Sequence, residues 1–184
     1  MNDFHISKTS QLNGSLFFFT LILITLSTSS FAKTTKFNDK LKAFEPYLGT
    51  WESKFSMNGK EVTDVSRFER ALNGTTLRVL HSIDNGVYGG ESLMFWDGVK
   101  KKMVFYYFTT AGFHTQGHLE WQKDNSFVAF EDVSGNQSGI TKVKSTSALQ
   151  GDTMTVSTSY LKNDVWTKPE SRTYRRSKKT VVFK

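Results

Sequence analysis

The fold follows from residues 89–121, which read GGESLMFWDGVKKKMVFYYFTTAGFHTQGHLEW. Two dense apolar runs, 93–96 and 103–108, are separated by a polar turn that begins with Asp97 and Gly98. Successive side chains of a β-strand point to opposite faces of the sheet, so each run is apolar on both faces. We therefore predict a β-hairpin that is covered on both sides. Antiparallel strands normally leave one face to water, so the second apolar face needs an additional cover. A helix, a partner subunit or a ligand could supply the second cover.

A short helix precedes the strands. Apolar residues recur there at helical spacings of four, three and four, at Phe37, Leu41, Phe44 and Leu48. Asn38 is the expected N-cap, and Pro46 disfavours helical geometry at the residue before it. The sequence therefore predicts about two helical turns, placed to cover one end of a barrel.

The rest of the chain has the pattern of short strands between turns. Nine turn signals, from Asn58-Gly59 to Asn163-Asp164, delimit ten strands at the roughly 8 to 14 residue spacing of an antiparallel meander. A sheet of ten strands curls, and its closure removes both exposed edges. We predict an all-β protein: a single antiparallel up-and-down β-barrel of about ten strands, preceded by the short N-terminal helix. A two-sheet sandwich is the alternative.

Residues 1–32 have the features of a cleavable signal peptide. The apolar run 16–26 is too short to span a bilayer, and Ser30, Phe31 and Ala32 form a small-x-small cleavage pattern. The alternative is an N-terminal membrane anchor. We expect residues 33–176 to form the barrel domain and 177–184 a basic C-terminal tail, in a periplasmic or secreted protein that makes no stable membrane insertion after processing.

The positive charge is concentrated at the C-terminus. The chain carries a net charge of +7, and residues 168–184 hold seven basic side chains against Glu170, which is 7 − 1 = +6. Such a tail could meet anionic lipid, lipopolysaccharide or nucleic acid, but we favour a solvated edge strand with a frayed end. Nucleic acid is not an expected partner, because the aromatic residues lie elsewhere. The chain has no cysteine, which excludes thiolate metal sites and cysteine nucleophiles.

The segment Gly49, Thr50, Trp51 after the helix, together with the arginine-rich segment 171–176, resembles the lipocalin and calycin-type barrels. The likeness is strongest to a group of uncharacterised bacterial lipocalin-like exported proteins that begin with Leu-Gly-Thr-Trp and end in Tyr-x-Arg. It implies that Trp51 closes the narrow end of the barrel with an arginine of the last strand packed on it. Arg172 and Arg176 are the two candidates for this cation–π contact.

The same Gly-x-Trp opening also resembles, more distantly, the haem-binding nitrobindin-like barrels. That resemblance implies an axial histidine from the later strands, yet no histidine follows His118. A haem would therefore need His81, His114 or His118 in a different position, or a tyrosine ligand such as Tyr160. We expect no cofactor.

His114 and His118 lie on one face of a predicted strand, with Glu120 beyond them. Two imidazoles and a carboxylate suit a divalent metal. Positions two apart are nearly 7 Å apart along a strand, so these histidines, four apart, are too distant to chelate one ion. We predict that both face solvent and that the chain has no metal site.

Known catalytic motifs are missing from the sequence: it has no Gly-x-Ser-x-Gly elbow, no His-Glu-x-x-His segment and no phosphate-binding glycine loop. We therefore name no catalytic residue. His81 shares the apolar face of its strand with Leu77, Val79 and Ile83, which makes it either a hydrogen-bonded core residue or a polar contact inside a cavity.

The main functional hypothesis is a barrel that encloses a small apolar ligand or lipid. The expected contacts are His81, Phe105, Tyr107, Trp121 and Phe127. The first alternative is a structural protein that forms a homodimer through the apolar hairpin. The second is a haem-binding or enzymatic barrel that uses a histidine.

Overall fold

The computed structural model describes residues 36–123, 125–134 and 138–184. The predicted signal peptide, with its cleavage point and the alternative membrane anchor, lies outside these residues. Within them, no helix combines the length and the apolar character needed to cross a membrane.

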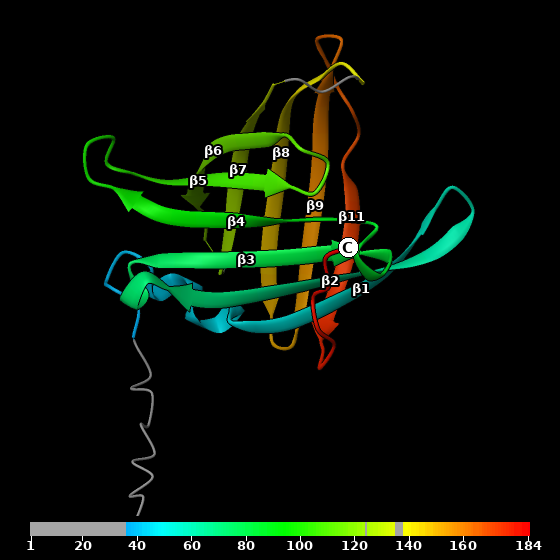
Figure 1. The fold of residues 1–184 in the computed structure, drawn as a ribbon. Coiled ribbons are helices and arrows are strands. Elements are labelled where there is room, and N and C mark those ends of the chain that lie inside the picture. Colours follow the sequence, from blue (N-terminus) through cyan, green and yellow to red (C-terminus); the bar gives the residue numbers. More distant parts are fainter. Residues whose placement is uncertain (1–35, 124, 135–137) are drawn as a thin grey trace, which may run out of the picture. The chain divides into compact units, whose positions relative to one another are not determined.

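Ten antiparallel strands form one closed barrel (Figure 1). Each strand from β1 to β9 pairs with the next along the chain, β9 also pairs with β11, and β11 returns to β1. The strands are β1 (Gly49–Met57), β2 (Lys60–Ala71), β3 (Thr76–Ile83), β4 (Tyr88–Asp97), β5 (Lys102–Thr109), β6 (His114–Trp121), β7 (Ser126–Val133), β8 (Ile140–Gln150), β9 (Thr153–Lys162) and β11 (Glu170–Arg176). The two-residue strand β10 (Val165–Trp166) adds to the edge of β9.

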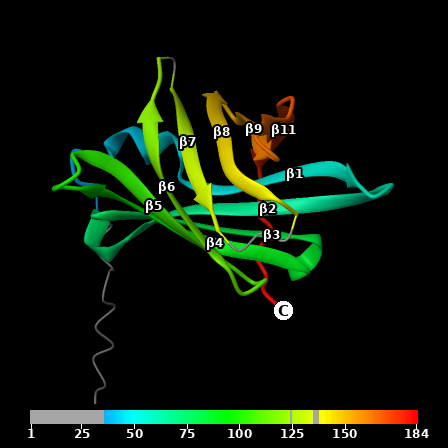
Figure 2. The same cartoon turned by 90° about the horizontal axis from the view of Figure 1, so that it is seen from above.

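This topology confirms the prediction of an all-β antiparallel barrel and excludes the two-sheet sandwich. In Figure 1, β1 to β5 cross in front of β7, β8 and β9, and the view from above in Figure 2 shows the sheet curving around an interior. The curvature follows from the twist of the strands, which brings the two ends of a ten-strand sheet together.

The turns owe their shape to residues that tolerate positive φ. Asn58 (φ 52°) and Gly59 (φ 76°) form the two-residue connection between β1 and β2, as expected of a primed hairpin turn. The turn signals at Asn73-Gly74 and Asn85-Gly86 fall in single 3-10 turns, η2 (Leu72–Gly74) and η3 (Asp84–Gly86).

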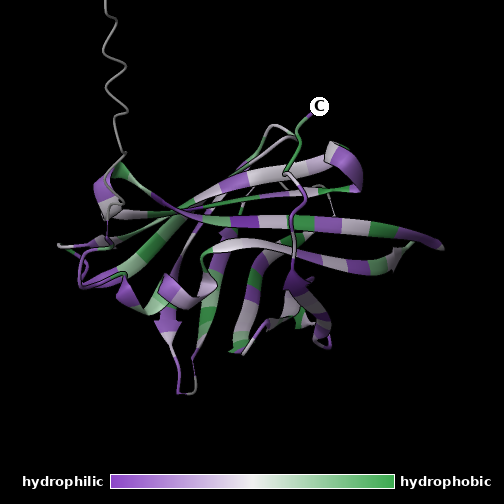
Figure 3. Ribbon diagram, turned by 90° about the horizontal axis from the view of Figure 1, so that it is seen from below, coloured by the Kyte–Doolittle hydropathy of each residue, from purple (hydrophilic) through white to green (hydrophobic). Residues whose placement is uncertain are grey.

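Hydrophobic and hydrophilic residues alternate along the strands, as the banding in Figure 3 shows. The inner face of the β4–β5 hairpin packs into the barrel core, where Met103 and Phe105 are buried. Its outer face is only partly covered: Tyr106 is 36% exposed and Phe108 is 49% exposed. Within the described residues, the predicted cover is therefore complete on the inner face of the hairpin and incomplete on its outer face.

A 3-10 helix, η1 (Lys42–Tyr47), replaces the two-turn helix expected over this region. Asn38 is not its N-cap: the cap is Leu41, and the Asn38 amide instead donates to the Gly74 carbonyl at 3.0 Å. Leu41, Phe44 and Tyr47 are fully buried.

These buried side chains fill one end of the barrel, which we call the closed end. The Phe44 ring lies 5.4 Å from the Phe127 ring of β7, measured between centroids. The Tyr47 hydroxyl donates to the carbonyls of Asn125 at 2.6 Å and Ser147 at 3.3 Å. Burial raises the pKa of Tyr47 to about 12.

Trp51 and Arg176 seal the closed end from outside. Trp51 is fully buried, and its indole N–H donates to the Tyr47 carbonyl at 2.8 Å. The Arg176 guanidinium lies 3.7 Å from the Trp51 ring centroid and donates to the carbonyls of Leu48 at 2.5 Å and Pro46 at 2.7 Å.

Of the two arginines proposed for this contact, Arg176 makes it. Arg172 lies over Phe55 instead, at 3.6 Å from the ring centroid. Gly49 has a φ of +110°, and a Cβ there would lie 3.1 Å from an Arg176 nitrogen, so glycine suits both the backbone and the arginine.

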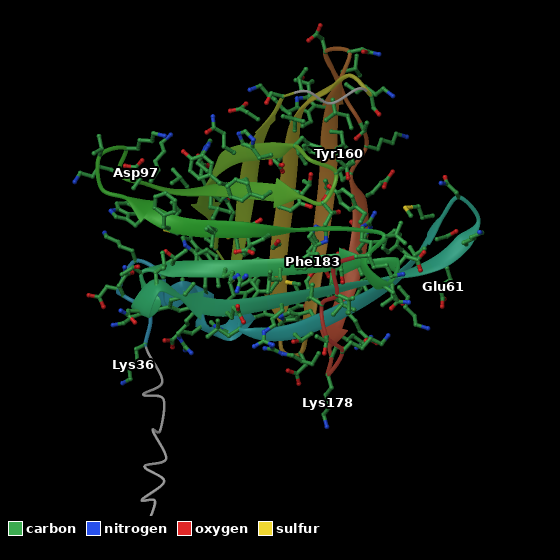
Figure 4. The ribbon with its side chains drawn as sticks, viewed as in Figure 1. Lys36, Glu61, Asp97, Tyr160, Lys178 and Phe183 are labelled. Carbon is green, nitrogen blue, oxygen red and sulfur yellow. The ribbon has the colours of Figure 1, made fainter. Side chains whose placement is uncertain are left out.

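The C-terminal tail follows the barrel wall, whereas a frayed end was expected. The Ser177 amide donates to the Thr50 carbonyl at 2.9 Å, and the Val182 amide donates to the Ser82 hydroxyl at 3.2 Å. Figure 4 shows the chain returning from Lys178 to Phe183 in front of the barrel. The tail is held because Ser82 and Glu52 offer it partners: the Lys179 ammonium lies 3.1 Å from the Glu52 carboxylate.

We predict that Arg176→Ala lowers the free energy of unfolding by about 2 kcal/mol, because it removes two charge-assisted hydrogen bonds and a cation–π contact. Urea unfolding followed by tryptophan fluorescence measures the change. Arg175→Ala, at an exposed position of the same strand, is the matched control and should change stability by less than about 0.5 kcal/mol. Equal effects of the two substitutions would contradict this account of the closed end.

We predict that Tyr47→Phe costs about 1 kcal/mol near neutral pH, through the lost hydroxyl contacts. The folded-state pKa of Tyr47 is about 12, above its ordinary value of 10.0. The stability that this group contributes is therefore complete below pH 10 and is lost as the pH rises toward 12. The difference in unfolding free energy between the wild type and Tyr47→Phe should shrink over that interval, and a constant difference would contradict the prediction.

Candidate ligand cavity

The barrel encloses a cavity of about 400 Å³. Every strand of the closed barrel except β1 contributes to its lining. This volume lies within the roughly 300 to 1,000 Å³ range of pockets that hold small molecules. The cavity is therefore the candidate functional site.

The lining is apolar toward the closed end and polar further along the strands. On β7 the inward residues run from Phe127 through Ala129 to Glu131, and on β5 from Phe105 to Tyr107. Phe127 contacts the η1 side chain Phe44, which fixes the apolar end of the series. Beyond these polar groups Val133, Ile140 and Phe113 line the cavity. A bound molecule would thus meet hydrocarbon next to the closed end, hydrogen-bonding groups in the middle and hydrocarbon again at the far end.

Two glycines let aromatic rings lie against the barrel wall. A Cβ on Gly90 would lie 2.4 Å from the Tyr107 ring and 2.3 Å from the Phe108 carbonyl. A Cβ on Gly117 would lie 2.7 Å from the Phe105 ring. None of these distances is sterically allowed. The missing side chains at Gly90 on β4 and Gly117 on β6 therefore make room for the two rings.

A chain of polar contacts runs through His81. Its Nε2 lies 2.6 Å from the Tyr107 hydroxyl, which in turn donates to the Tyr88 hydroxyl at 3.2 Å. Its Nδ1 lies 3.5 Å from an Asp64 carboxylate oxygen. Burial, with a smaller effect from the bond to Tyr88, raises the pKa of Tyr107, so this phenol stays protonated.

Asp64 is a buried carboxylate with several partners. Its second oxygen accepts a hydrogen bond from the Tyr174 hydroxyl at 2.9 Å, and the Ser66 hydroxyl lies 3.5 Å from the first. Burial, followed by the nearby Asp64 charge, raises the pKa of Tyr174. The negative charge of Asp64 is thus stabilised inside the barrel by neighbouring groups.

Glu131 is the second carboxylate of the cavity. Its carboxylate accepts a hydrogen bond from the Thr115 hydroxyl of β6. Burial raises its pKa, and the contact with Thr115 opposes part of that rise. In contrast to Asp64, it has no second hydrogen-bond donor and no ion pair among the described residues.

Four of the five residues proposed for ligand contact line the cavity: His81, Phe105, Tyr107 and Phe127. Trp121 does not line the cavity, so the prediction is wrong for this residue. Its ring packs on Phe44 at a centroid distance of 4.7 Å, because η1 occupies the space that this last position of β6 faces.

Sequence reasoning missed the two carboxylates Asp64 and Glu131, and also Tyr88 and Tyr174. For Glu131 the signal was present, since it has the same strand parity as Phe127 and Ala129. For Asp64 the partners could not be read from the sequence, because Tyr174 comes from β11, which does not pair with β2, and His81 comes from the neighbouring strand β3.

His114 and His118 project from the outer face of β6. His114 stacks on Phe108 and His118 on Phe130, with centroid distances of 6.0 and 5.1 Å. In the part of the chain that the structure describes, no three metal-binding side chains form a cluster. His81 could bind a metal or a haem iron through Nε2 only by giving up its contact with Tyr107.

No family model matches the sequence, and no curated protein matches it either. The crystal structure of Rv2717c from M. tuberculosis is similar in fold, with a TM-score of 0.58 and 11% sequence identity over 78% of this chain and 100% of that one. At this identity the likeness concerns the fold alone. It is consistent with a calycin-like barrel.

Proposed function

We propose that this protein binds a small organic molecule in the interior of its barrel. The observation that carries the proposal is the cavity of about 400 Å³, with apolar side chains at one end and a polar cluster further along. Ligand pockets typically combine an apolar lining with a few well-placed polar groups. The resemblance in fold supports this only by analogy.

The expected ligand is amphiphilic. Its apolar part would lie against Phe105, Phe127 and Met154, where each buried Å² of hydrocarbon contributes about 25 cal/mol. Its polar part would reach His81 and Tyr107, whose hydroxyl and imidazole groups can hydrogen-bond to it.

We also propose that the protein belongs with the exported lipocalin-like group and acts in the periplasm or outside the cell. The support is the Leu-Gly-Thr-Trp segment at 48–51, the Trp51–Arg176 contact and the leader-like residues 1–32. Detection of a mature N-terminus at residue 33 in an envelope or secreted fraction would test the assignment.

Filling the cavity should abolish binding. Ala129 lines the cavity, so Ala129→Phe places a ring in the ligand space and should weaken binding of the neutral fluorescent probe N-phenyl-1-naphthylamine by about tenfold or more. The measurement is a fluorescence titration, with circular dichroism to confirm that the barrel is folded.

The matched control for this substitution is Ala148→Phe. Ala148 is exposed on β8, the strand that neighbours β7; it pairs with Ser126 and does not line the cavity. It should leave the dissociation constant unchanged within about twofold. Absence of probe binding to the wild type, or equal weakening by both substitutions, would overturn the proposal.

Self-association through the β4–β5 hairpin stays a prediction and is the second candidate. The observation in its favour is the outer face of the hairpin, where Phe95 stacks on Tyr106 at 6.4 Å and Phe108 is half exposed. If a dimer forms there, Phe108→Lys should convert it to a monomer in sedimentation velocity runs at micromolar concentration. A wild-type protein that is monomeric under these conditions would exclude the dimer.

A further inference from the structure

The charged groups that line the cavity are unbalanced. The carboxylates Asp64 and Glu131 line it beside the imidazole of His81, and none of the described lining residues is lysine or arginine. His81 faces Asp64, at 3.5 Å from Nδ1 to the carboxylate oxygen. Together with the hydroxyls of Tyr174 and Ser66, it satisfies Asp64 within the protein.

Glu131 has no such compensation. The Thr115 hydroxyl is its one hydrogen-bond partner in the described part of the chain, and no basic group contributes to the shift of its pKa, which burial dominates. Glu131 is half-buried, and a carboxylate withdrawn from water without a nearby cation is less stable in its charged form until a positive charge approaches it. A positively charged ligand would supply what this side chain lacks.

Tyrosine rings surround the same region. Tyr107 and Tyr160 line the same cavity as Glu131, and the negative charge of Glu131 contributes to the raised pKa of each. Tyr88 joins them through its contact with Tyr107. The faces of tyrosine rings attract organic cations, and phenol oxygens accept hydrogen bonds from ammonium groups.

Arg172 is a basic residue beside this region, in a recess that shares Tyr160 with the cavity. It lowers the pKa of Tyr160, against the effect of burial, so its charge reaches the edge of the cavity. Its guanidinium stacks on Phe55 at 3.6 Å. With Glu170 it lines this smaller recess, which shares Val156, Thr158, Tyr160 and Tyr174 with the main cavity. An anionic ligand would have to recruit this arginine away from Phe55.

From this arrangement we infer that the cavity selects an organic ammonium ion with an apolar substituent, its nitrogen at Glu131 and its hydrocarbon against Phe105 and Phe127. The inference rests on the proposed function and names the class of ligand for that site. Glu131 becomes the residue that determines specificity, through a charge-assisted hydrogen bond to the bound nitrogen.

Three probes of equal chain length test the inference by isothermal titration calorimetry at neutral pH: n-octylamine, n-octanol and octanoate. Each has a chain of eight carbons, with a positive, neutral or negative end. We expect n-octylamine to bind about tenfold or more tightly than n-octanol, and octanoate to bind most weakly.

Glu131→Gln keeps the shape of the side chain and removes its charge. In this variant the preference for n-octylamine over n-octanol should fall to about threefold or less. The control is Asp132→Asn: the neighbouring carboxylate points outward, pairs with Lys142 at 2.6 Å, and should leave the preference intact. The comparison of the three probes on the wild type stands even if Glu131→Gln does not fold.

Each contrary result has a separate meaning. If n-octanol binds and n-octylamine gains nothing, or if Glu131→Gln keeps the full preference, the inference is overturned while the binding function stands. If octanoate binds most tightly and Arg172→Gln abolishes that advantage, the site selects carboxylates and the inference is again overturned. If none of the three probes binds, the proposed function fails together with the inference.

Discussion

The structure depends on the pairing of β11 with β1. This pairing turns an open meander into a barrel, and it sets Trp51 opposite Arg176 in the strand register. The arginine then reaches over the indole to the carbonyls of Pro46 and Leu48 and so joins the last strand to the segment before the first. Closure in sequence order also removes the free strand edges that a ten-strand sheet would expose to other chains.

Closure fixes what the interior contains. Once the strands are joined in a ring, every second residue must point inward, whatever its polarity. Near η1 these positions are apolar and the space is filled by Phe44 and Tyr47. Further along, the same strands place Asp64, His81 and Glu131 inside, where each must find a partner. The polar cluster is therefore a product of strand parity combined with the registers of nonadjacent strands.

Much of the fold could be predicted from local signals. Asn-Gly pairs mark several turns because their residues adopt positive φ, and the two-residue alternation identifies the strands. The contacts between distant elements could not be predicted. The family resemblance offered both Arg172 and Arg176 as partners for Trp51, and only the register of β11 decides between them. Trp121 was placed in the cavity because nothing in its strand shows that η1 lies beside it. Asp64 was missed because the groups that stabilise it come from β3 and β11.

The close packing of aromatic rings on Gly90 and Gly117 affects how the volume of the cavity could change. At these two positions the barrel wall has no side chain, and the rings of Tyr107 and Phe105 pack against the backbone. They therefore occupy less of the barrel interior. A methyl group at Gly90 or Gly117 would meet the ring and also a backbone carbonyl oxygen, that of Phe108 at 2.3 Å or of Phe130 at 2.0 Å, so both the strand and the ring would have to move. The volume of the cavity therefore depends on the missing side chains of Gly90 and Gly117 as well as on the side chains that line it.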